Sequence, residues 1–119
     1  MTVYLGGLHF LGPIHVGELV EIRALVIRTG RTSLDIAVDL YAGDPKRGER
    51  RRTGHCVVVF VALGSDGRPA QVPPWRPETD LDRALEGYAA RLSALRKQMD
   101  AEMDARLGTL LPDAGVVPA

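Results

Sequence analysis

This 119-residue chain contains one cysteine, Cys56, and it carries no formal net charge because 15 Lys and Arg residues balance 15 Asp and Glu residues. A single cysteine excludes an internal disulfide and is typical of a reducing compartment, so we expect a cytoplasmic protein. The balanced charge offers no electrostatic footprint for a nucleic acid or an anionic membrane. These absences favour a small neutral ligand or another protein as the partner.

Long apolar runs are also missing from the sequence. No run approaches the ~20 residues that span a bilayer, and the amino terminus lacks the charged and apolar regions of a secretory signal. Membrane insertion and export are therefore not expected. What the chain does have is 45% hydrophobic residues, which is enough for one domain with a single core.

Apolar patterning predicts an antiparallel sheet of four strands. Residues 18–29 and 33–42 alternate apolar and polar side chains, as strands with one buried face do. Residues 55–63 are continuously apolar, so this strand is expected to lie centrally or to be covered on both faces. Residues 2–10 supply the fourth strand, and the charged, glycine-rich residues 43–54 are expected to form a hairpin loop.

The two alternating strands predict which face of the sheet is buried. We expect the polar side of residues 33–42, which carries Asp35 and Asp39, to lie in solvent. The apolar side needs a cover. It comprises Val20, Ile22, Ala24 and Val26 of the first strand with Leu34, Ile36, Val38 and Leu40 of the second.

The period becomes helical after a proline-rich linker at residues 72–77. Thr79 or Asp80 can cap the start of the helix, and Gly108 can stop it. Its apolar stripe must pack on this sheet or on another subunit, and the stripe comprises Leu81, Leu85, Tyr88, Leu92, Leu95, Met99 and Met103. The expected organisation is a sheet over 1–77, a helix over 78–107 and a flexible tail over 108–119.

Four consecutive segments resemble the hotdog-fold acyl-CoA thioesterases of the acyl-CoA hydrolase family: FLGPIHVGELVEIRA, RTGRTSLDIAVDLYAG, VVVFVALGSDGRPAQVPPW and the charged helix. The resemblance runs from about Val3 to Arg96. It implies an α+β, partial hotdog fold, with an antiparallel sheet of about four strands followed by a long C-terminal helix. It also implies hydrolysis of acyl-CoA to free coenzyme A and a carboxylate, with no cofactor, in a homo-oligomer or beside another hotdog subunit.

The resemblance further implies a central helix and a loop before the strand equivalent to residues 2–10, and these carry the catalytic carboxylate in the family. Only Met1 precedes that strand here. Thioester hydrolysis needs a carboxylate and a donor for the oxyanion, so we expect an upstream segment or another subunit to supply both. No catalytic residue is therefore assigned. The alternative is a non-catalytic module that binds acyl-CoA or a protein partner.

By resemblance, the coenzyme A site lies beside the strand edge at Gly30, Arg31, Thr32 and Ser33, where hydroxyls can bond pantetheine amides and the arginine can reach a phosphate. The hairpin loop adds Lys46 and Arg47, which belong to a local excess of three positive charges between residues 44 and 52. The residues alone leave two other interpretations open. The turn can be plain structure, and the loop can be a solvated hairpin tip.

Other chemistry-bearing residues favour structural roles. Cys56 lacks basic neighbours on its own face, so it is interpreted as a small core residue. No H-x-x-x-H spacing is present, and no metal site is predicted. The sequence has no G-x-S-x-G elbow, which argues against a hydrolase triad. The residue types of a triad do occur, at His9, His15, His55, Ser33, Asp35 and Asp39.

Overall fold

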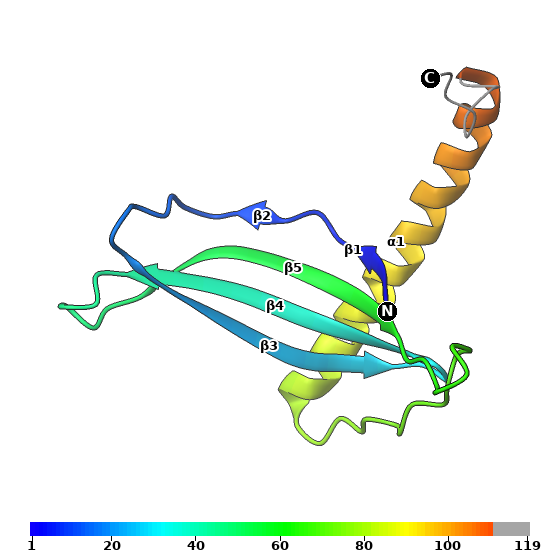
Figure 1. Cartoon of the computed structure of the whole chain (residues 1–119), viewed down its shortest axis with the longest axis horizontal. Helices are drawn as coiled ribbons and strands as arrows, with labels where there is room; N and C mark the ends of the chain where they lie inside the picture. The colour runs from blue at the N-terminus through cyan, green and yellow to red at the C-terminus, as the bar shows by residue number, and fades with distance from the viewer. Residues whose placement is uncertain (111–119) are drawn as a thin grey trace.

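The computed structural model describes residues 1–110, apart from the side chains of Thr2 and Val3, as one antiparallel sheet and one long helix (Figure 1). This confirms the α+β class and the order of sheet and helix. The elements are β1 (Thr2–Leu5), β2 (His9–Phe10), β3 (Leu19–Thr29), β4 (Ser33–Gly43), β5 (Arg51–Val61) and α1 (Asp80–Leu110).

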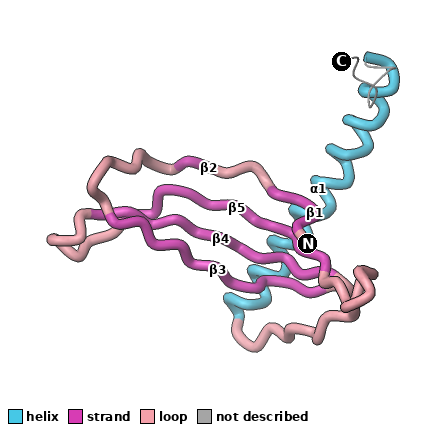
Figure 2. The backbone as a smooth tube through the Cα atoms, in the orientation of Figure 1, coloured by secondary structure: helices cyan, strands magenta, loops and turns pink. Residues whose placement is uncertain are grey.

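The sheet has five strands in the order β1-β5-β4-β3, and β2 also pairs with β5 (Figure 2). The apolar strand β5 therefore lies between two neighbours, as its composition predicts. Residues Cys56 to Val59 are each 9% exposed. Side chains on both faces of β5 are thus buried, because successive residues of a strand point to opposite faces.

The single strand expected over residues 2–10 is wrong, because Gly6, Gly7 and Leu8 separate β1 from β2. The amide of Gly6 donates to the carbonyl oxygen of Val57 at 3.0 Å. A Cβ at Gly6 would lie 2.9 Å from that oxygen, so the close approach of the two backbones requires glycine there. The chain remains beside β5 while regular pairing is interrupted.

The hairpin loop between β4 and β5 is shorter than predicted, because β5 begins at Arg51 rather than at residue 55. Arg51 donates to both carboxylate oxygens of Glu18 at 2.6 and 2.7 Å. The side chain of Arg52 lies 3.5 Å from Asp39 on β4. These cross-strand ion pairs let a charged segment extend the strand.

Helix α1 begins where the sequence predicts, with Thr79 at its N-cap. The hydroxyl of Thr79 accepts from the amide of Asp82 at 3.0 Å, and the Asp82 carboxylate accepts from the Thr79 amide at 3.3 Å. This reciprocal arrangement is a capping box. The predicted stop at Gly108 is wrong, because α1 continues to Leu110. The rest of the predicted tail, residues 111–119, lies outside the described residues.

Helix α1 covers the face of the sheet that the pattern assigned to solvent. The cluster at this contact comprises Ile27, Ala37, Val57 and Ala89, with Leu85 and Leu92 packed against it. Ala37 and Ala89 are 5% and 1% exposed, and their small side chains let helix and sheet approach closely. Asp35 lies on the same face and is 9% exposed, so the prediction that it lies in solvent is wrong.

No helix covers the opposite, apolar face within the described residues, and its edges are exposed. Ile22 pairs with Leu40, and Leu40 pairs with Gly54, which in turn pairs with Phe10, so these positions share one side of the sheet. Ile22 is 65% exposed and Phe10 is 74% exposed. Figure 1 shows α1 crossing behind the sheet, away from this face.

Candidate functional site

The turn between β3 and β4 holds four of the predicted binding residues in a fixed backbone geometry. The amide of Gly30 donates to the Ser33 carbonyl at 2.9 Å. The carbonyl of Thr32 accepts from Ala62 at 2.9 Å, and the carbonyl of Arg31 accepts from Val72 at 2.8 Å. The turn is thus held by the segment that follows β5. Arg31 itself is exposed.

The predicted basic loop is less positive than its sequence indicates. Arg50 forms an ion pair with Glu21 on β3, Arg51 with Glu18 just before β3, and Arg52 with Asp39 on β4. Three of the five cations are therefore balanced by β3, β4 and the segment before β3. Lys46 and Arg47 remain exposed at the tip, with Asp44 and Glu49 beside them in the sequence.

The turn and the basic loop lie at opposite ends of β4. Ser33 begins this strand and Gly43 ends it. Eleven strand residues span ~35 Å at about 3.3 Å per residue. The structure therefore does not bring Lys46 and Arg47 close to Gly30–Ser33 within one chain.

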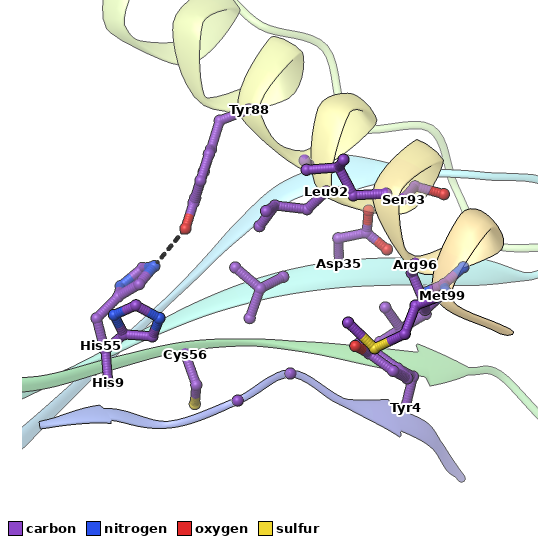
Figure 3. A pocket seen from close by; sticks show the side chains of 16 residues that line it. Tyr4, His9, Asp35, His55, Cys56, Tyr88, Leu92, Ser93, Arg96 and Met99 are labelled. Atoms are coloured by element: carbon purple, nitrogen blue, oxygen red, sulfur yellow. Dashed lines mark hydrogen bonds between the residues drawn. The ribbon is translucent and has the colours of Figure 1, made fainter. Parts of the chain in front are cut away.

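A cleft of about 370 Å³ lies between α1 and the β5–β1 side of the sheet (Figure 3). Its floor is formed by Val57 and Val59 of β5, and Leu92 of α1 forms part of its roof. At one end the imidazole of His55 lies 2.8 Å from the hydroxyl of Tyr88. The other end is bounded by Tyr4 and by Arg96, whose guanidinium lies 4.9 Å from the tyrosine ring centroid.

The polar end of the cleft contains a hydrogen-bonded chain of three side chains. Nδ1 of His55 lies 2.9 Å from Oδ1 of Asp39, and Nε2 meets the hydroxyl of Tyr88. Burial raises the pKa of Tyr88, and the charge of Asp39 adds to this effect. The phenol therefore remains protonated at neutral pH. It links α1 to β5 as a hydrogen-bonding group rather than as a nucleophile.

The triad interpretation fails on geometry. Asp39 and His55 do contact each other, but the third member of the chain is Tyr88. Ser33 lies six positions from Asp39 on β4, which is ~20 Å along a strand. Asp39 and His55 lie on neighbouring strands and pair across the sheet, so strand alignment could have found their contact. The contact with Tyr88 depends on where α1 lies.

Asp35 lies inside the cleft, on the covered face. Burial raises the pKa of its carboxyl group, and the positive charges of Arg28 and Arg96 partly oppose that rise. The nearest guanidinium nitrogen of Arg28 is 3.8 Å from the carboxylate. Asp35 is therefore a buried acid that sequence reasoning missed, because its alternation with apolar neighbours is the usual signal of a solvent face.

The remaining predicted groups occupy ordinary structural positions. Cys56 is buried, which agrees with its interpretation as a small core residue, and burial raises the pKa of its thiol. His15 is exposed, and its amide donates to Glu18 at 2.6 Å. Among residues 1–110, no group of three His, Cys, Asp or Glu side chains is placed to hold a metal ion. None of the helices in that range is long and apolar enough to cross a membrane.

Comparison with known proteins shows what these features are similar to. Residues 1–49 match the Thioesterase superfamily. The match covers less than half of the chain. Its sheet and long helix are shared by acyl-CoA hydrolase structures, which confirms the hotdog resemblance.

One relative of this chain is a Bacillus subtilis protein named as an uncharacterized acyl-CoA thioester hydrolase, YkhA. The two are 30% identical over 97 residues, which cover 82% of this chain and 56% of YkhA. The chain thus spans about half the length of the curated relatives it matches.

Two solved structures show the same arrangement. An acyl-CoA hydrolase from Staphylococcus aureus, solved with butyryl coenzyme A, coenzyme A and coenzyme A disulfide, matches with a TM-score of 0.79 and 25% identity. The match covers 92% of this chain and 67% of that one. A hexameric acyl-CoA thioesterase matches with a TM-score of 0.78 and 29% identity, over 85% of this chain and 65% of that one.

Proposed function

We propose that this chain provides the sheet and C-terminal helix of an acyl-CoA thioester hydrolase that acts as an oligomer. Its substrate is an acyl-CoA, and it needs no cofactor. The observation that supports this most directly is the superposition of the sheet together with α1 on acyl-CoA hydrolases, one of them bound to coenzyme A. A cytoplasmic location remains a prediction from cysteine usage, and cell fractionation tests it.

The coenzyme A site proposed here lies at the β3–β4 turn. The backbone of this turn is held by Ala62 and Val72, so its side chains are presented from a rigid element. No ion pair to Arg31 occurs within residues 1–110, which leaves its guanidinium able to bind a phosphate. Thr32 and Ser33 offer hydroxyls beside it for the pantetheine amides.

Lys46 and Arg47 contribute to the same function from a second chain. Because they lie at the far end of β4, one chain cannot direct both groups to one phosphate. In the proposed oligomer, the loop of one copy lies next to the turn of another. The two exposed cations would then attract the phosphates of a coenzyme A molecule held mainly by the neighbouring copy.

The decisive experiment measures release of the coenzyme A thiol from acyl-CoAs of several chain lengths. It uses two forms of the protein, the 119-residue chain and the protein purified from its native host. We expect turnover with at least one substrate. Arg31→Ala should raise KM for acyl-CoA about tenfold, the lower end of the range for a charge-assisted phosphate contact. It should leave turnover of the corresponding acyl-pantetheine, which lacks the nucleotide phosphates, unchanged.

The control is Arg68→Ala, which removes an exposed arginine from the turn that follows β5. Its KM should match that of the unmodified protein. Binding of acyl-CoA without turnover by either form of the protein would overturn the hydrolase proposal and support the non-catalytic module. An equal effect of both substitutions would overturn the assignment of Arg31.

A further inference from the structure

The cleft between α1 and the sheet contains a buried acid without a hydrogen-bond donor. Asp35 is 9% exposed as a residue and 13% exposed in its side chain. Among the described residues its nearest cation is Arg28 at 3.8 Å, which is beyond hydrogen-bond distance. No described side-chain oxygen is both sealed from solvent and unbonded, so the Asp35 oxygens remain accessible from the cleft. Because buried polar groups are nearly always hydrogen-bonded, their donor must come from solvent or from a ligand.

A guanidinium group with unused donors lies in the same cleft. Arg96 follows Leu92 by one helical turn and lines the cleft together with Asp35 (Figure 3). It stacks over the ring of Tyr4, and it forms no ion pair within the part of the chain that the structure describes. Its positive charge nevertheless reaches Asp35, where it lowers the pKa of the carboxyl group against the effect of burial. The acid and the base are therefore near each other, and each still lacks a bonded partner.

The rest of the lining determines what the body of a ligand can be. Val57 and Val59 form an apolar floor, and Leu92 forms part of the roof. Among residues 1–110, the Asp, Glu, Lys and Arg side chains that line the cleft are Asp35 and Arg96, so their formal charges balance. The volume of about 370 Å³ is in the range of sites for small molecules. These features fit a small ligand with an apolar body and no net charge.

We propose that the cleft binds an apolar α-amino acid as its zwitterion. The ammonium group donates to Asp35, the carboxylate accepts from Arg96, and the side chain packs on Val57 and Val59. An alkyl carboxylate would leave Asp35 without a donor, and an alkylamine would leave Arg96 without an acceptor. The zwitterion satisfies both groups. The proposal does not depend on the hydrolase function, because none of residues 30–33 lines the cleft.

Calorimetric titration of the 119-residue chain tests the ligand class without any turnover. The probes are L-leucine and L-phenylalanine. They are compared with 4-methylpentanoate, which lacks the ammonium group of leucine, and with 3-methylbutylamine, which lacks its carboxylate. We expect saturable binding of at least one amino acid and about tenfold weaker binding of both truncated compounds, because each loses a charge-assisted hydrogen bond. Failure of both amino acids to bind up to their solubility, or equal affinity of either truncated compound, would overturn the proposal.

Substitutions test the two charged residues. Asp35→Asn and Arg96→Gln should each weaken amino-acid binding about tenfold, and circular dichroism verifies that each variant is folded. The matched control is Arg91→Gln, which removes an exposed arginine of α1 that does not line the cleft and should leave the affinity unchanged. Full affinity in either the Asp35 or the Arg96 variant would overturn the proposal. Displacement of the amino acid by pantetheine would also overturn it, because the cleft would then belong to the acyl-CoA substrate.

Discussion

The face of the sheet that α1 covers can be tested by making one chemical change at two positions of β3. Ile27 is fully buried under the helix, whereas Ile22 is 65% exposed on the opposite face. Ile→Ala at a buried site costs about 2–5 kcal/mol. At Ile27 we expect about 2–3.5 kcal/mol, because its neighbours include two alanines and the partly buried Leu85 and Leu92, which can move to fill part of the space.

The same substitution at Ile22 should cost less than about 1 kcal/mol, because most of that side chain is already in water. Both sites are in one strand, so the loss of β propensity cancels in the comparison. Equilibrium urea unfolding of the 119-residue chain measures the difference. With m near 1.5 kcal/mol/M, the midpoint should fall by about 1.3–2.3 M for Ile27→Ala and by about 0.7 M or less for Ile22→Ala. Equal shifts would refute the assignment of the buried face.

Two further predictions concern pH, and a third concerns the start of α1. Burial raises the pKa of Asp35, so the free energy of unfolding falls as pH rises from 3.8 through the folded-state pKa. Asp35→Asn should therefore stabilise the protein at pH 7. It should also flatten the plot of unfolding free energy against pH above pH 3.8. Hydrogen bonds from Arg51 lower the pKa of Glu18 from 4.5 to about 2, so stability that is present above pH 4.5 is lost as pH falls toward 2. Glu18→Gln should remove this fall in unfolding free energy, as measured by urea titrations at several acidic pH values. Thr79→Ala should cost about 1 kcal/mol by removing the N-cap, whereas Thr79→Ser should cost little, and an unchanged melting temperature for the alanine variant would contradict the capping assignment.

Local rules account for most of the secondary structure. The alternating and continuous apolar patterns indicated β3, β4 and β5, and Thr79 marked the start of α1. These signals are local, since they depend on side-chain period and on one capping hydroxyl. The errors arose where contacts between distant segments decide the outcome. The break at Gly6 depends on Val57, and the early start of β5 at Arg51 depends on Glu18.

The candidate site was predicted less well. The hydrophobic pattern shows which face of the sheet is apolar, but it does not show which face the helix packs against. The apolar side of β4 is the better core surface, yet the linker delivers α1 to the side that carries Asp35 and Ala37. A helix needs close approach as well as apolar area, and Ala37 opposite Ala89 provides it. Asp35 is buried as a consequence.

The same reasoning explains why the charge of the basic loop was overestimated. Counting residues 44–52 treats each arginine as available to a ligand, but pairing across the sheet places Arg50 and Arg51 beside Glu21 and Glu18. A guanidinium already bonded to two carboxylate oxygens can bind a phosphate only by giving up that pair. Arg31 has no such partner within residues 1–110. We therefore propose Arg31, in a rigid turn, as the main phosphate contact, with Lys46 and Arg47 of a neighbouring copy adding to it.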